Sequence, residues 1–184
     1  MIIHKNKGLL TVIWTPFKNY STSLHRCLLK NPEFIGVNDK HPYRFEKQGR
    51  ENFSNVVDAH TNICNTLWGL EGSRQILPIR NPYSRTISNY YYAKKKNWIP
   101  ENYTILDFLY SKSHLHFPVV EIYQYTHLVH VESIVEEFKI LGIDISDIEH
   151  RNKGDYTEHK LSEKEKELIY FWHYPDFVAG GYAQ

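Results

Sequence analysis

Residues 75–96 read QILPIRNPYSRTISNYYYAKKK and predict a strand that passes directly into a helix. The apolar run from Ile76 to Ile79, interrupted by Pro78, is typical of a buried or edge strand. Asn81 then stands where a helix N-cap belongs, and Pro82 suits the first helical position. Beyond them, four apolar or aromatic side chains recur at helical spacing and define one face of the predicted helix: Tyr83, Ile87, Tyr90 and Tyr91.

This predicted corner carries groups that favour an anion. Arg80 ends the strand, and we expect free backbone N–H groups at the helix start. On the side of the helix opposite its apolar face lie Arg85, Ser88 and Asn89. The helix dipole, the N–H donors and the guanidinium all favour a phosphate at this point. The alternative is an ordinary strand–helix corner whose arginines pair with carboxylates.

A second corner of the same kind is predicted near the start of the sequence. The run LLTVIW, residues 9–14, is apolar on both alternating faces, as a central parallel strand should be. After a loop rich in Lys, Ser and Thr, residues 22–30 predict a helix with Leu24, Cys27 and Leu28 on one face. A strand, a polar loop and a helix in this order can cradle a phosphate. The pattern G-x-x-x-x-G-K-[ST] is absent, so the loop is not a nucleoside-triphosphate P-loop.

The string R-N-P-Y-S-R-T-I-S-N-Y, residues 80–90, resembles the 3′-phosphate-binding motif of sulfotransferases that use 3′-phosphoadenosine 5′-phosphosulfate (PAPS). The family pattern runs R-[DE]-P-x-x-R-x-x-S-x-Y. The resemblance implies that Arg80 and Ser88 hold the 3′-phosphate of the nucleotide. Asn81 replaces the acidic residue of the family, which preserves the helix cap and removes a negative charge.

The string P-F-K-N-Y-S-T-S-L, residues 16–24, resembles the 5′-phosphosulfate loop of the same family, commonly P-K-x-G-[ST]-T-S-L. Aligned from its C-terminal end, Lys18 takes the place of the family lysine. Phe17 is an extra residue, and Tyr20 replaces a glycine that would let backbone N–H groups approach the phosphate closely. The resemblance implies that the following residues bind the 5′-phosphosulfate: Lys18, Asn19, Tyr20, Ser21, Thr22 and Ser23.

A candidate catalytic base follows another predicted strand, NVVDA, residues 55–59. His60 comes directly after this strand, and open α/β sheets bind ligands at the carboxyl ends of their strands. Several carbohydrate sulfotransferases carry a histidine upstream of the 3′-phosphate arginine and use it to take the proton of the acceptor. By that resemblance His60 is the base, because an imidazole titrates near neutral pH. His41 and Asp58 are the alternatives.

The later part of the sequence continues the resemblance. The apolar run THLVHV, residues 126–131, predicts a strand, and residues 132–141 predict a helix with one apolar face. This unit resembles the later strand–helix unit of sulfotransferases. Glu132 is a candidate for orienting site residues, and the alternative is an acid at a helix start without such a role. The string Y-P-D-F-V-A-G-G-Y, residues 174–182, resembles the Y-x-x-D-F-x-x-x-G-Y close of this family and is expected to be a packing segment.

The whole chain is consistent with one α/β domain, residues 1–184. Strands alternating with helices predict a parallel sheet flanked by helices, and the resemblance implies a sulfotransferase fold related to that of P-loop nucleotide kinases. A formal net charge of +1 argues against a broad nucleic-acid-binding surface. Apolar runs are too short for a signal sequence or a membrane span, and Cys27 and Cys64 are interpreted as reduced thiols. We therefore expect a cytoplasmic protein. His114 and His116 lack a third ligand at credible spacing, so no metal site is predicted.

The function that these motifs imply is transfer of a sulfuryl group from PAPS to an acceptor hydroxyl. The product of the donor is adenosine 3′,5′-bisphosphate (PAP), and no metal is required. The resemblance favours a saccharide over another small molecule as the acceptor. Two other functions stay open: a nucleotide or small-molecule kinase of related fold, and a non-catalytic nucleotide- or glycan-binding module. The kinase would need a Walker lysine and a metal-binding carboxylate, and the module is suggested by Tyr20 and Asn81.

Overall fold

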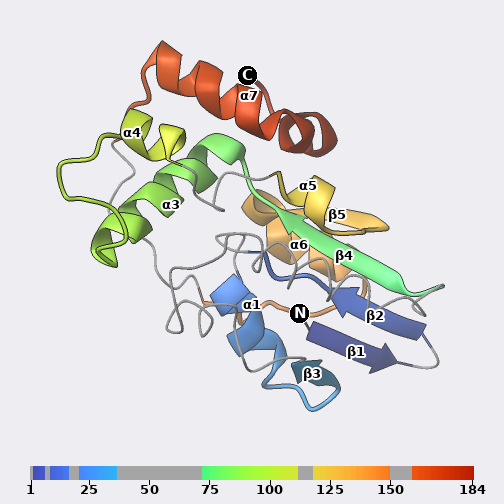
Figure 1. The fold of residues 1–184 in the computed structure, drawn as a ribbon. Helices are drawn as coiled ribbons and strands as arrows, with labels where there is room; N and C mark the ends of the chain where they lie inside the picture. Colours follow the sequence, from blue (N-terminus) through green and yellow to red (C-terminus); the bar gives the residue numbers. More distant parts are fainter. Residues whose placement is uncertain (1, 7–8, 17–20, 37–71, 112–117, 150–158) are drawn as a thin grey trace.

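The computed structural model describes residues 2–6, 9–16, 21–36, 72–111, 118–149 and 159–184. Within them, five strands form one mixed sheet in the order β3-β1-β2-β4-β5 (Figure 1). The strands β2, β4 and β5 are parallel, whereas β1 runs antiparallel to both of its neighbours, β2 and β3. Their bounds are Ile2–Asn6 (β1), Leu9–Ile13 (β2), Phe34–Gly36 (β3), Arg74–Ile79 (β4) and His127–His130 (β5).

Helices cover the sheet and also extend beyond the carboxyl ends of its parallel strands (Figure 1). They are α1 (Ser21–Leu28), α3 (Pro82–Lys95), α4 (Ile105–Tyr110), α5 (Val119–Ile122), the short 3-10 helix η3 (Val131–Ser133), α6 (Ile134–Ile140) and α7 (Glu163–Gly180). The predicted α/β class with parallel strands and flanking helices is therefore confirmed. No helix in the described ranges has the length and apolar character needed to cross a membrane.

Most of the predicted elements that fall in the described ranges are present, with ends shifted by a few residues. The run from Ile76 to Ile79 belongs to β4, which lies between β2 and β5, so the buried strand is confirmed and the edge strand is excluded. The strand β1 was not predicted, because its sequence IIHKN has only two apolar residues. The strand predicted at residues 55–59 lies outside the described residues.

Alternate residues of the strands bury the two faces of the sheet in separate cores. One face is covered by α1 and α6, and its buried strand residues include Ile13, Ile76 and Val129. The other face is covered by α5, and its buried strand residues include Val12, Trp14 and Leu77. The three positions of α1 that were predicted to share an apolar face are all buried in the first core: Leu24, Cys27 and Leu28.

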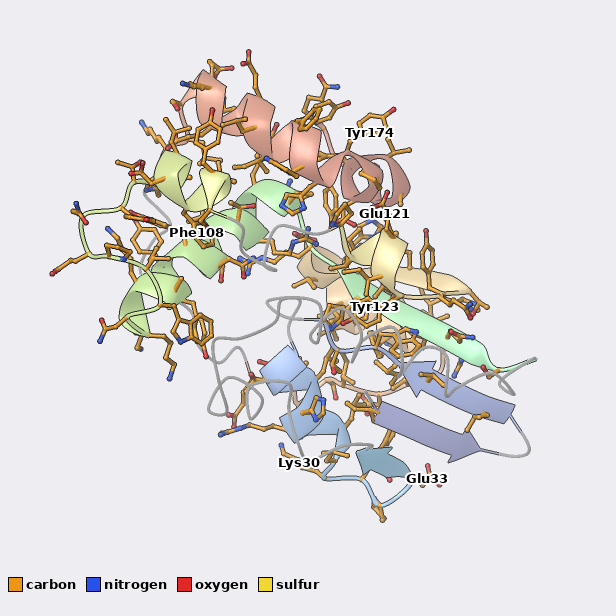
Figure 2. All side chains as sticks on the ribbon, in the orientation of Figure 1. Lys30, Glu33, Phe108, Glu121, Tyr123 and Tyr174 are labelled. Atoms are coloured by element: carbon orange, nitrogen blue, oxygen red, sulfur yellow. The ribbon has the colours of Figure 1, made fainter. Side chains whose placement is uncertain are left out.

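A third core joins α3, α4 and α7 beyond the strand ends. Phe108 of α4 lies close to Tyr90 of α3, with ring centroids 5.8 Å apart (Figure 2). Tyr83 of α3 meets Phe177 of α7 edge to face at 4.9 Å. The predicted apolar face of α3 therefore packs against its two neighbouring helices, and this packing fixes the helix that follows β4.

The ladder between β2 and β4 ends at a defined point because of two prolines. Its register runs to the pair Ile13 and Ile76, and Trp14 N donates to Ile76 O at 2.9 Å. The next parallel rung would need the N–H groups of residues 78 and 16, which are both proline and have none. Beyond this point β4 stays paired with β5 as far as Ile79, while the segment after β2 is released from β4.

A buried ion pair anchors α3 to α7. Arg85 Nη2 donates to Asp176 Oδ2 at 2.5 Å and lies 2.9 Å from His173 Nδ1. The Arg85 and Asp176 side chains are only 2% and 0% exposed. Asp176 also accepts the N–H groups of Val119 and Val120 at the start of α5, at 3.1 and 3.0 Å. One carboxylate thus ties α3, α5 and α7 together.

We expect Asp176→Ala to lower the free energy of unfolding by about 3–5 kcal/mol, because it leaves the Arg85 guanidinium buried without its counter-charge. Urea unfolding followed by circular dichroism measures the change. The control is Glu163→Ala, which removes the exposed pair of Glu163 with Lys166 and should leave the midpoint nearly unchanged. A loss in Asp176→Ala no larger than in this control would contradict the anchoring role.

Candidate functional site

The carboxyl ends of β2 and β4 place the two predicted corners on one edge of the sheet. The strands are parallel neighbours, and in Figure 1 their arrowheads point toward the same side, where α1 and α3 follow. A ligand bound at this edge can be reached from both corners. Several residues predicted for this site lie outside the described residues: Lys18, Asn19, Tyr20, His60 and the alternative bases His41 and Asp58.

Arg80 lies at the end of β4, and its side chain is held along the first turn of α3. Its Nε donates to Ser84 Oγ at 3.0 Å, and the Ser84 hydroxyl donates to Asn81 O at 3.0 Å. Ser88 follows Ser84 by four residues, so the two serines lie on the same side of the helix. Arg80 precedes α3, so this spacing relates only the two serines, and Ser88 itself is buried, with 3% of its surface exposed. Among the described carboxylates, none forms an ion pair with Arg80.

The start of α3 differs from the prediction, because its backbone N–H groups are not free. Asn81 Oδ1 accepts from the N–H groups of Tyr83 at 2.9 Å and Ser84 at 3.4 Å, as an N-cap does. The Asn81 N–H donates to Glu132 Oε1 at 2.9 Å, and Pro82 has no N–H. The expectation of an anion site on free N–H groups is therefore wrong. A phosphate at this corner would be held by side chains.

Arg85 was expected on the anion-facing side of the helix, and this expectation is also wrong. Its guanidinium is buried against Asp176 and His173 of α7. It follows the alternative stated for this corner, in which an arginine pairs with a carboxylate. The two arginines of the motif therefore differ: Arg85 anchors a helix, whereas Arg80 stays at the edge of the sheet.

At the second corner, a histidine joins the two ends of the predicted phosphosulfate loop. His25 Nε2 lies 3.1 Å from Thr15 Oγ1, which connects the end of β2 to α1. Ser21 begins α1 and Thr22 is exposed, whereas Ser23 is buried. Ser23 lines a pocket on the side of α1 together with Arg26, Cys27, Lys30, Asp147 and Glu149. Thr22 and Ser23 therefore lie in different surroundings.

The pocket beside α1 contains a thiol that is protonated and structural. Cys27 Sγ donates to Asp147 Oδ1 at 2.9 Å, and the other oxygen of this carboxylate accepts from Lys30 Nζ at 2.7 Å. Burial, and then the hydrogen bond to Asp147, raises the pKa of the Cys27 thiol to about 12. Because the thiolate is the reactive form, Cys27 is a poor nucleophile near neutral pH. Cys27 is free, as predicted, and Cys64 lies outside the described residues.

Two residues of this edge were missed as site residues, Ser84 and Tyr182. Ser84 lies in the first turn of α3, but Arg80 precedes the N-cap Asn81, so helical spacing could not have predicted their contact. Tyr182 OH donates to Glu132 Oε2 at 2.9 Å, which places a residue predicted only for packing next to the start of α3. Glu132 contacts Asn81 across 51 positions of sequence, and no local pattern could have shown that contact.

The part of the chain that the structure describes contains no group of three or more His, Cys, Asp or Glu side chains that could hold a metal ion. The pair His114 and His116 lies outside it. No protein-family model, curated protein or solved structure matches the chain. The fold and the site thus define an α/β protein with two strand–helix corners at the carboxyl edge of a parallel β2-β4-β5 unit. Its function is argued from the residues of that edge.

At the same edge, His130 ends β5 and joins it to α6 and to the end of α7. Its Nδ1 lies 3.0 Å from Glu137 Oε1, and its Nε2 lies 2.9 Å from Gly180 O. Burial lowers the pKa of His130, but the hydrogen bonds to Gly180 and Glu137 and the charges of Glu137 and Glu132 outweigh it. The pKa therefore stands above its ordinary value of 6.5.

We expect the free energy of unfolding to fall as the pH rises through the pKa of folded His130. The folded state binds this proton more tightly than the unfolded state, so the stabilisation is complete below about pH 6.5 and is lost above the folded pKa. Urea unfolding at a series of pH values measures the slope, which should flatten in His130→Asn. His127→Asn, on the same strand, is the control. Equal slopes for the wild type and His130→Asn would exclude this source of pH dependence.

Proposed function

We propose that the protein transfers a sulfuryl group from PAPS to an acceptor hydroxyl, with a saccharide as the acceptor. The observation that carries this proposal is the position of Arg80. It leaves the carboxyl end of β4 beside Ser84, on the side of α3 that also carries Ser88. The segment after β2, which begins the loop PFKNYSTSL, leaves the sheet at the same edge. The two motifs thus start from neighbouring strands, so one nucleotide with a phosphate on each side of its ribose could contact both.

The residues at this edge fit a 3′-phosphate. A guanidinium presents its donors in a planar fork that matches phosphate oxygens, and the Nε of Arg80 is already oriented by Ser84. No described carboxylate competes for the two Nη atoms. Ser88, one turn further along α3, is buried, so the proposal requires the phosphate to reach its hydroxyl below the surface. PAPS, when bound, supplies the activated sulfuryl group, and Arg80 with Ser88 would hold its 3′-phosphate.

The reaction needs a base and a group that stabilises the leaving oxygen. The acceptor oxygen bonds to sulfur while the bond from sulfur to the 5′-phosphate oxygen breaks. His60 takes the proton of the acceptor hydroxyl. Lys18, with the loop N–H groups and the hydroxyls of Ser21 and Thr22, would neutralise the charge that builds on the departing oxygen, whereas Ser23 lines the pocket beside α1. Arg80 and Ser88 align the donor for in-line attack by holding its 3′-phosphate.

The charge of the transferred group accounts for a mechanism without a required metal. A sulfuryl group carries less negative charge than a phosphoryl group, so positive side chains and hydrogen-bond donors can balance it. Phosphoryl transfer instead depends on a metal ion together with a glycine-rich loop and its lysine. The sequence lacks that loop pattern, which favours the sulfotransferase over the kinase.

Thermal unfolding in the presence of nucleotides separates the proposed function from its alternatives. We expect PAP without metal to raise Tm and ATP with Mg²⁺ to leave it nearly unchanged, because only PAP carries both a 3′- and a 5′-phosphate. Stabilisation by ATP with Mg²⁺ alone would indicate a kinase. Stabilisation by PAP without sulfate transfer from PAPS to any member of a broad saccharide panel would indicate a non-catalytic nucleotide-binding module.

Replacing Arg80 tests the 3′-phosphate assignment directly. Arg80→Ala should weaken PAP binding by about 1.5–3 kcal/mol, the value of a hydrogen bond to a charged group, or about one to two factors of ten in Kd. Isothermal titration calorimetry measures the change. Lys139→Ala, which removes an exposed cation of α6, is the control for net charge and should leave Kd unchanged. Unaltered PAP affinity in Arg80→Ala would remove this assignment.

A further inference from the structure

We infer that Glu132 and Tyr182 are positioning residues that hold Arg80 in place for the 3′-phosphate, an inference that rests on the proposed function. The reason is the way in which the backbone on both sides of Arg80 is held. The carbonyl of Ile79, just before Arg80, lies 3.3 Å from Tyr182 OH. The N–H of Asn81, just after Arg80, donates to Glu132 Oε1 at 2.9 Å.

Glu132 and Tyr182 act as one unit, because they are bonded to each other. Tyr182 OH donates to Glu132 Oε2 at 2.9 Å, and its single proton is shared with the more distant Ile79 O. Burial, and then the charge of Glu132, raises the pKa of the Tyr182 phenol above its ordinary value, so it stays a donor near neutral pH. The carboxylate of Glu132 is therefore used by one backbone N–H and one phenol, and it is not paired with the Arg80 guanidinium.

The backbone at the end of α7 places the Tyr182 phenol at the edge of the sheet. Gly181 ends the helix with a positive φ of 61°, and Tyr182 N donates to Phe177 O at 3.1 Å. A Cβ on Gly180 would meet the Tyr182 ring at 2.5 Å, so a glycine is needed where the ring folds back. The His130 ring packs edge to face on Tyr182, with centroids 5.6 Å apart. The phenol thus has a fixed direction.

The same side chain of Arg80 is supported locally by Ser84, which accepts from its Nε. Ser84 orients the guanidinium relative to α3, whereas Glu132 and Tyr182 bond to the backbone groups of Asn81 and Ile79, on the two sides of Arg80. A guanidinium binds phosphate through two N–H donors that must reach two oxygens at the same time. Binding is therefore sensitive to a shift of the Arg80 backbone. Loss of the Tyr182 hydroxyl should therefore weaken recognition of the 3′-phosphate and not recognition of the rest of the nucleotide.

The experiment measures the Kd of PAP and of AMP, which lacks the 3′-phosphate, by calorimetry on the full chain. The ratio of the AMP Kd to the PAP Kd measures how much the 3′-phosphate contributes to binding. Tyr182→Phe keeps the ring and removes the hydroxyl, and we expect the preference for PAP to fall by about 3- to 10-fold, with AMP binding unchanged. In the background Arg80→Ala, adding Tyr182→Phe should leave the ratio unaltered, since the two act through the same contact.

A matched control and a second variant keep the test decisive. Tyr174→Phe removes a hydroxyl from the exposed side of α7 (Figure 2) and should preserve the ratio. Glu132→Gln, which cannot accept both hydrogen bonds on charged oxygens, should lower it as Tyr182→Phe does. A wild type without preference for PAP would overturn the proposed function and this inference with it. This inference alone would be overturned if Tyr182→Phe and Glu132→Gln both kept the wild-type preference for PAP over AMP. It would also be overturned if Tyr182→Phe still lowered that preference in the Arg80→Ala background.

Discussion

The pairing of β2 with β4 determines where both corners of the candidate site begin. Because the strands are parallel neighbours, the chain leaves each of them at the same edge of the sheet. Because residues 16 and 78 are prolines, the ladder cannot continue past Trp14 and Ile76. A longer ladder would bond the segment after β2 to β4 and prevent it from turning toward α1. The two prolines therefore set the point at which the corners separate.

The two arginines of the central motif differ in burial and in their partners. A buried ion pair costs desolvation, which is offset only when the remaining donors and acceptors are satisfied. Asp176 meets this condition through two backbone N–H groups of α5 in addition to Arg85. The pair holds α3 against α5 and α7, so the helix that supports Arg80 has a fixed position. The Arg80 side chain is then oriented by a contact at its own corner, the hydrogen bond from its Nε to Ser84 Oγ.

Local features of this fold could be predicted from the sequence, whereas features that depend on distant partners could not. The cap at Asn81 and the buried face of α1 follow from side-chain type and helical spacing, and both are present. The bond of the Asn81 N–H depends on Glu132, and the burial of Arg85 depends on Asp176, 91 positions away. Neither partner is marked by any pattern near residue 80.

Part of the candidate site could also be read from local spacing. Ser84 and Ser88 are one helical turn apart on α3, and Arg80, just before the helix, donates to the first of them. The missed strand β1 has a physical reason as well: it lies in the sheet through pairing with β2 and β3, and its own sequence has little apolar alternation.

Glu132 is a negative charge at the start of α3, and under the proposed function it would restrict how a phosphate approaches a corner without free N–H groups. It lies at the positive end of the α3 dipole, where a negative charge is stabilised, and it occupies the place that an anion would otherwise take. An amide at Asn81 caps the helix without adding a second carboxylate beside Glu132, and so avoids like-charge repulsion. Under the proposed function, a phosphate would approach from the side of Arg80 and Ser84, away from the negative charge of Glu132. One acidic residue thus holds the backbone next to Arg80 and also limits the directions from which an anion can approach it.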